Sequence, residues 1–159
     1  MNDSETDSQS IKALIVFREN GETDNLFVPI LCDAIRMAGI DVRCSTKEFW
    51  DSDKHYDIIH FQWPEEVVGW TCNDPDIIRR LEERISFFRS GGTRFVYTRH
   101  NVRPHYANGI ISRAYDIIES QSDIVVHMGR FSRDEFLTKY PDSQNVIPEY
   151  RHQNTFHFQ

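Results

Sequence analysis

The chain has 159 residues, a formal net charge of −7, 39% hydrophobic residues and 13% aromatic residues. This length fits one globular domain. The acidic balance argues against a basic surface that binds nucleic acid, and no apolar run approaches the ~20 residues that a membrane helix needs. We therefore expect no nucleic-acid partner and a cytoplasmic location, with peripheral contact at the inner membrane left open.

The three cysteines, Cys32, Cys44 and Cys72, are widely spaced and form no Cys-x-x-Cys motif. Neither a disulfide framework nor a zinc site is indicated, and a reducing cytosol is the simplest environment for such a chain. The N-terminus is polar and acidic, which is the reverse of a signal peptide.

Short apolar segments alternate with helical patterns along most of the chain. Strands are predicted at residues 11–17, 40–45, 57–61, 93–98, 123–127 and 145–148, and helices at 24–38, 74–89, 107–120 and 132–140. The apolar runs lack a period of two, which is typical of strands covered on both faces of a parallel sheet. We therefore expect an α/β Rossmann-like three-layer sandwich with a mainly parallel sheet of about six strands.

The same pattern gives the expected domain boundaries. Residues 1–10 are predicted to be a disordered tail, 11–150 the Rossmann-like domain, and 151–159 a tail or the start of an interdomain linker. Residues 47–55 and 62–73 show no regular pattern and are predicted as loops.

Individual helix ends also carry signals. Asp24 or Asn25 is a candidate cap for the first predicted helix, and Ser132 with Glu135 three residues later forms a potential capping box for the last one.

Two predicted strands end in clusters of polar, aromatic and proline residues. These are residues 57–65 (DIIHFQWPE) and residues 95–105 (FVYTRHNVRPH). In an open α/β sheet, ligands bind just beyond the carboxyl ends of the strands. Imidazole and amide groups both donate and accept hydrogen bonds, as sugar hydroxyls do. The two strand ends therefore predict one shared cleft for a hydroxyl-rich ligand.

Common catalytic motifs are missing from the sequence. It has no Gly-x-Gly-x-x-Gly, no Walker-type Gly-Lys-Ser/Thr and no Gly-x-Ser-x-Gly elbow. The carboxylate pair Asp51 and Asp53 precedes a strand, so we interpret it as part of a solvated loop and not as a metal site. Four histidines lie at or near predicted strand ends: His60, His100, His105 and His127. Their spacing matches no known ligand signature, and we expect no metal.

These segments, followed by residues 122–127 (SDIVVH), resemble the N-terminal domain of GT-B glycosyltransferases, most closely the bacterial group 1 (GT4-like) enzymes of polysaccharide assembly. Those domains contain a strand ending in a His-x-His-Trp-Pro-like run, a strand ending in Thr-x-His-Asn, and an Ala/Ser-Asp strand followed by a helix. The resemblance covers residues 11–150. It implies an acceptor-binding domain that works with a second Rossmann-like domain, which binds the nucleotide-sugar donor.

The resemblance also implies roles for individual residues. A histidine placed like His100 reaches the hydroxyls of the donor sugar, and Glu65 is a candidate general base if its pKa is suitable. We expect His100 and Glu65 to be catalytic, and six residues to bind substrate: Asn20, Gly21, Trp63, Asn101, Arg103 and His105. No metal is usually required in this family.

Two departures from the family pattern affect the expected activity. Gln62 stands where many relatives have a second histidine, and the Glu-rich donor motif with its partner Arg/Lys has no counterpart in this sequence. We therefore expect the acceptor-binding half of a hexosyltransferase acting on a glycan or lipid-linked acceptor. Alone it should have little activity and bind no cofactor, because the nucleotide sugar would occupy a separate C-terminal domain or subunit. The alternatives are a non-catalytic α/β binding or interaction module, or another small-molecule enzyme built on the same sheet.

Overall fold

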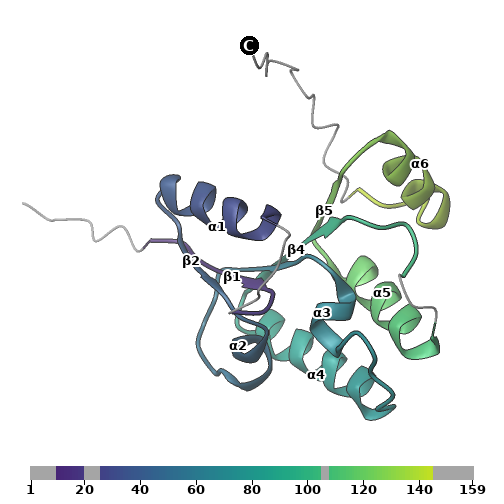
Figure 1. The fold of residues 1–159 in the computed structure, drawn as a ribbon, viewed down its shortest axis with the longest axis horizontal. Coiled ribbons are helices and arrows are strands. Elements are labelled where there is room, and N and C mark those ends of the chain that lie inside the picture. Colours follow the sequence, from purple (N-terminus) through teal and green to yellow (C-terminus); the bar gives the residue numbers. More distant parts are fainter. Residues whose placement is uncertain (1–9, 20–25, 105–107, 145–159) are drawn as a thin grey trace, which may run out of the picture.

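The computed structural model describes residues 10–19, 26–104 and 108–144, which form an α/β sandwich around a five-stranded parallel sheet (Figure 1). The strands are β1 (Lys12–Val16), β2 (Asp41–Cys44), β3 (Ile58–Phe61), β4 (Arg94–Arg99) and β5 (Ile124–His127). The helices are α1 (Phe27–Met37), α2 (Thr46–Asp51), α3 (Pro64–Val68), α4 (Asp76–Ser90), α5 (Gly109–Gln121) and α6 (Arg130–Lys139). The predicted Rossmann-like fold class is therefore confirmed, while the expected sixth strand at 145–148 lies outside the described residues.

The order of the strands determines where a ligand crevice can form. The sheet runs β2-β1-β3-β4-β5, and every pair is parallel. After β1 the chain moves outward to β2, then crosses back to β3 on the other side of β1. In sheets of this kind the point where the order reverses lies between β1 and β3, and ligands bind there beyond the carboxyl ends.

Two hydrophobic cores lie on opposite faces of the sheet. The larger core packs side chains of β1, β3, β4 and β5 against α2, α4, α5 and α6, whereas the smaller core lies between the sheet and α1. The last three residues of β1, Leu14, Ile15 and Val16, are fully buried because both faces of this strand are covered. Their uninterrupted apolar run is what the sequence pattern of a buried parallel strand predicts.

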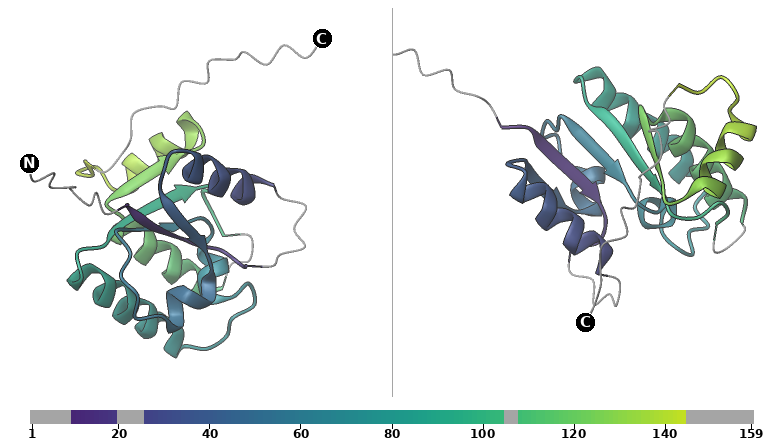
Figure 2. Two further views of the ribbon diagram at one scale, coloured as in Figure 1. Left: turned by 90° about the vertical axis from the view of Figure 1, so that its left-hand side faces the viewer. Right: turned by 90° about the horizontal axis from the view of Figure 1, so that it is seen from above.

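The face of the sheet that carries α1 is only partly covered. Seen from above in Figure 2, α1 lies over β1 and β2, while no helix among the described residues lies over β4 and β5 on that side. Ile124 and Met128 are accordingly exposed at the β5 end of this face.

Two short helices form where the sequence predicts loops. In α2, Ser45 accepts a hydrogen bond from the backbone N–H of Glu48 at 2.9 Å, and Phe49 is fully buried in the larger core. In α3, Pro64 occupies the first turn, where its missing N–H costs nothing. Both helices are too short for a periodic sequence signal, and tertiary packing decides their structure.

The expected capping box at Ser132 is wrong. Helix α6 begins two residues earlier than predicted, with Gly129 at the N-cap position and no side-chain cap. Ser132 lies inside the first turn, and its hydroxyl contacts Nδ1 of His127 at 3.1 Å. The proposed caps Asp24 and Asn25 lie outside the described residues, and α1 begins at Phe27.

Within the part of the chain that the structure describes, no helix combines the length and apolar character required to cross a membrane.

Candidate functional site

An aromatic cluster lies at the carboxyl ends of β1, β3 and β4, beside the point where the strand order reverses. Trp63 stacks on His100 with ring centroids 4.1 Å apart and an interplanar angle of 13°. Phe27, the first residue of α1, packs edge-on against the same imidazole at 4.9 Å, and Phe17 approaches Trp63 at 5.7 Å. The two predicted strand ends therefore converge at one place.

The imidazole of His100 is neutral and held in one tautomer. Its Nε2–H donates to the side-chain oxygen of Gln62 at 2.9 Å, which leaves Nδ1 as a hydrogen-bond acceptor. Burial lowers the pKa of His100 to about 4. An imidazole with so low a pKa is a weak general base near neutral pH. Its geometry suits recognition of a ligand hydroxyl better than proton transfer.

Gln62 carries an unsatisfied amide in the same cluster. The residue is fully buried, and its Nε2 has no hydrogen-bond partner among the described residues. A buried polar group without a partner costs about 1–3 kcal/mol. Because Gln62 is fully buried, a ligand oxygen would satisfy this nitrogen only after a local rearrangement. Sequence reasoning noted Gln62 only as a departure from a family pattern. The signal for its role is a polar side chain at the carboxyl end of an apolar central strand.

His60 supports the cluster from within β3. Its Nε2 lies 2.8 Å from the hydroxyl of Thr98 on the neighbouring strand β4. Burial, followed by the charge of nearby His100, lowers the pKa of His60 to about 4. Because this side chain is paired inside the sheet, the contact fits the packing role that the sequence suggests for it.

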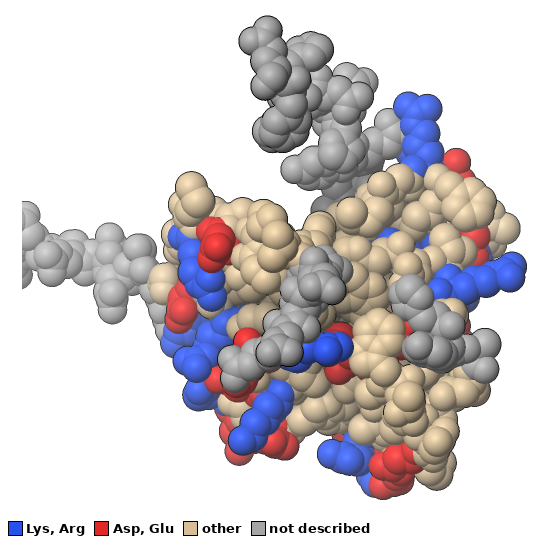
Figure 3. Space-filling view, in the orientation of Figure 1, with Lys and Arg blue, Asp and Glu red and all other residues tan. Residues whose placement is uncertain are grey.

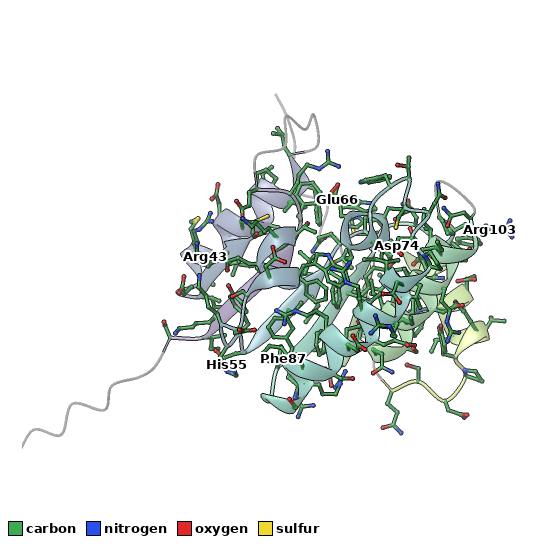
Figure 4. The ribbon with its side chains drawn as sticks, turned by 90° about the horizontal axis from the view of Figure 1, so that it is seen from below. Arg43, His55, Glu66, Asp74, Phe87 and Arg103 are labelled. Atoms are coloured by element: carbon green, nitrogen blue, oxygen red, sulfur yellow. The ribbon has the colours of Figure 1, made fainter. Side chains whose placement is uncertain are left out.

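A second polar group lies where β1 and β3 end. The Arg18 guanidinium donates to Oε1 of Glu66, with Nε at 2.8 Å, and Trp70 Nε1 donates to the same oxygen at 2.8 Å. Glu66, labelled in Figure 4, is buried, whereas Arg18 is about half exposed. Sequence reasoning did not single out this triad, because Arg18 lies 48 positions before Glu66.

Glu65 and Asn101 meet in an internal network. Glu65 is fully buried, and the Tyr115 hydroxyl contacts its two carboxylate oxygens at 3.1 and 3.0 Å. The side chain of Asn101 hydrogen-bonds the same tyrosine, whose pKa is raised by burial and by Glu65. A carboxylate in this position meets a substrate only after a local rearrangement, and its catalytic role stays a prediction.

Of the remaining predicted site residues, the structure describes only Arg103. Arg103 is exposed and lies apart from Glu66 in Figure 4. Asn20, Gly21 and His105 lie outside the described residues. Of the eight predicted residues, the structure brings Trp63 and His100 into direct contact.

Arg99, which directly precedes His100, has a structural role. Its side chain is almost completely buried, and it donates to Glu119 at 2.7 Å and to the Ser132 carbonyl at 2.9 Å. It also pairs with Glu135 at 2.5 Å. These contacts join β4 to α5 and α6, so this guanidinium is not available to a ligand in the structure.

One face of the molecule is poor in charged side chains. In Figure 3 the face toward the viewer carries a broad area without Lys, Arg, Asp or Glu, and charged side chains gather mostly at its margins. The described residues contain no group of three or more side chains that could hold a metal ion.

Two surface cavities lie elsewhere in the molecule. One, of about 410 Å³, is between α4 and α5, and the other, of about 440 Å³, is on α6. Neither is lined by the aromatic cluster. The first is lined mostly by the polar side chains of two helix surfaces, and neither has converging buried polar groups. We place the candidate site at the strand ends on the basis of its chemistry.

Comparison with known proteins gives no relative: no family model, no curated protein and no solved structure matches this chain. The resemblance to glycosyltransferase N-domains therefore depends on the residues of the strand ends alone.

Proposed function

We propose that this chain is the acceptor-side half of a nucleotide-sugar-dependent glycosyltransferase of the GT-B, group 1 type. In this proposal the cluster at the ends of β3 and β4 contacts sugar hydroxyls, and a separate domain or subunit binds the nucleotide sugar. The observation that carries the proposal is the contact between Trp63, His100 and Gln62 at the reversal point of the strand order.

The chemistry of these groups favours a sugar over other ligands. Trp63 and His100 are both partly exposed, and aromatic rings of this kind commonly pack against the C–H face of a sugar ring. In the same cluster, Nδ1 of His100 is a hydrogen-bond acceptor, and Nε2 of Gln62 is a donor without a partner among the described residues. Hydroxyl groups both donate and accept, so they suit both kinds of atom. Because Gln62 is fully buried, a ligand would reach its amide only after a local rearrangement.

The charge distribution supports the expectation of low activity for the isolated chain. Transfer from a nucleotide sugar requires cationic groups that stabilise the leaving diphosphate. Arg18 lies near the strand ends but is already paired with Glu66, and Arg99 is buried in its own ion-pair cluster. In the proposed enzyme the second domain supplies this stabilisation.

The test is a reconstitution experiment. The donor-binding domain of a group 1 glycosyltransferase is fused to this chain or added in trans, and sugar transfer is measured for the parent and for His100→Ala. His55→Ala is the matched control, because His55 is exposed and distant from Glu66 in Figure 4. We expect His100→Ala to lose most of the transfer activity and His55→Ala to keep it. Equal activity of the two variants would remove His100 from the mechanism.

One observation favours a second candidate, a non-catalytic binding module. Glu65, the predicted general base, is buried and hydrogen-bonded to Tyr115, which is what a structural carboxylate shows. The two functions differ in a simple measurement. Saturable sugar binding by the isolated chain, combined with no transfer after reconstitution with several donor domains, would favour the binding module.

A further inference from the structure

Two cysteine thiols meet between α1 and β2. Cys32 lies on the sheet-facing side of α1 and is buried, while Cys44 is the last residue of β2 and is partly buried. The two side chains pack in the smaller core, and their thiols are hydrogen-bonded to one another. The Cys44 thiol also lies 3.8 Å from the carbonyl oxygen of Phe17. The third cysteine, Cys72, packs against the larger core on the other face.

This arrangement brings two sulfur atoms into contact without a covalent bond. A disulfide requires an S–S distance of about 2 Å and side chains directed toward each other. The hydrogen bond between the thiols brings the two sulfur atoms near one another, which is the first requirement for a disulfide.

We propose that Cys32 and Cys44 are a redox modification site, at which a reversible disulfide fastens α1 to the carboxyl end of β2. The inference does not depend on the proposed glycosyltransferase function, since it uses only the two thiols and their position.

The reaction is a two-electron oxidation of the dithiol by a peroxide. Cys44 is the less buried residue of the two, and its thiolate attacks one oxygen of hydrogen peroxide to give a sulfenic acid and hydroxide. The thiolate of Cys32 then attacks the sulfenic sulfur, forms the S–S bond and displaces the second hydroxide. Together the two thiols lose two protons and two electrons, and the peroxide becomes two molecules of water.

The environment of the thiols predicts how the reaction responds to pH. Burial raises the pKa of Cys32, and burial together with the neighbouring thiol raises the pKa of Cys44 to about 12. Since the thiolate is the reactive form, the disulfide should form slowly at neutral pH. Its rate should increase about tenfold per pH unit in the alkaline range below these pKa values.

The bridge has a consequence for the aromatic cluster. Helix α1 begins at Phe27, which packs against His100, and the Phe17 carbonyl lies beside Cys44. A bond from α1 to β2 fixes the position of this helix next to the candidate site. Oxidation is therefore expected to restrict the movement of Phe27 relative to His100.

The experiment uses the full chain with Cys72→Ser, so that only the proposed pair remains. The folded protein is treated with excess hydrogen peroxide at several pH values, and its intact mass is measured without reductant. We expect the loss of two hydrogen atoms, a peptide map that joins Cys32 to Cys44, reversal by dithiothreitol and a higher thermal midpoint for the oxidised form.

Two controls make the result decisive. Cys32→Ser and Cys44→Ser, each combined with Cys72→Ser, should yield no intramolecular disulfide and no rise in the thermal midpoint. The proposal is overturned if the folded protein keeps two free thiols under conditions in which the same chain, unfolded in urea, forms the disulfide. A product linked only between two molecules would overturn it as well.

Discussion

Arg99 and His100 are consecutive residues at the end of β4, and their side chains lie in different environments on opposite faces of the sheet. Arg99 is buried against α5 and α6, with carboxylate partners on both helices. His100 faces α1 and is only partly buried, and its partner Gln62 keeps an amide nitrogen without a hydrogen bond. A buried charge whose partners are all internal indicates a structural centre. A partly exposed aromatic cluster at the carboxyl ends of the strands is the better candidate for a ligand site.

The structural centre extends beyond a single ion pair. Glu119 accepts from Arg99 and also from Lys139 Nζ at 2.7 Å, and the Tyr140 hydroxyl lies 3.2 Å from it. The same lysine reaches Asp116 at 2.7 Å. Through these contacts β4, α5 and the end of α6 share one network, whereas the described contacts of the aromatic cluster are ring contacts and the hydrogen bond between His100 and Gln62.

The largest effect should come from breaking the buried ion pairs. Arg99→Met removes the cation between Glu119 and Glu135, and we expect the free energy of unfolding to fall by about 3–5 kcal/mol, because a carboxylate remains buried without its main partner. Urea unfolding followed by circular dichroism measures this change.

The control for this variant is Arg79→Met. Arg79 pairs with Asp76 and Glu83 on the exposed surface of α4, where ion pairs contribute little to stability. We therefore expect no measurable change in the free energy of unfolding. If both variants lost the same stability, the Arg99 cluster would have no special structural role.

A smaller effect should appear as a pH dependence on the same face. His127 is buried, and its Nε2 has no hydrogen-bond partner among the described residues. Burial, followed by repulsion from Arg99, lowers the pKa of His127 to about 4. The unfolded chain therefore binds a proton before the folded one does. The contribution of the neutral His127 to the free energy of unfolding is fully present above the ordinary histidine pKa of about 6.5. It is lost as the pH falls toward 4.

This contribution can be isolated by comparing the wild type with His127→Gln. Within the window from pH 6.5 to 4, the free energy of unfolding of the wild type should fall more steeply, by at most about 1.4 kcal/mol per pH unit. Urea titrations at half-unit pH steps measure the two slopes. Equal slopes would mean that His127 does not take up a proton on unfolding.

The smallest effect on stability, and the largest contrast with Arg99, is expected for Gln62→Leu. The substitution removes an unsatisfied amide together with one hydrogen bond to His100, so the free energy of unfolding should change by less than about 1 kcal/mol. Sugar binding, measured by chemical-shift changes on titration with a panel of monosaccharides, should be lost.

Gln121→Leu is the matched control for this prediction, because Gln121 is an exposed glutamine at the end of α5. It should leave both stability and binding unchanged. A large loss of stability in Gln62→Leu would instead assign Gln62 to the structural core and weaken the comparison between the two faces.

Much of the fold could be predicted from the sequence. The five described strands lie at the predicted positions, and four of the helices match predicted ones to within a few residues. Long apolar runs and amphipathic periods carry these signals. Helices α2 and α3 were missed because Phe49 and Val67 are held by packing against residues distant in sequence.

The candidate site was predictable only in part. The sequence indicated that the ends of β3 and β4 carry the chemistry, and Trp63 and His100 do stack on each other. It could not indicate that Glu65 would be directed to Tyr115, fifty positions away, or that Arg18 would pair with Glu66.

The sequence by itself determined the alternation of strands and helices and the residue types at each strand end, because these depend on local periodicity and composition. The tertiary structure decided which of those residues face one another and which face solvent. Neighbouring side chains on a strand point to opposite faces of the sheet. One residue more or fewer before the turn would therefore move a side chain from the face with the candidate site to the face with the larger core. At the end of β4 that alternation separates Arg99 from His100, and the packing of α1, α5 and α6 gives each its partners.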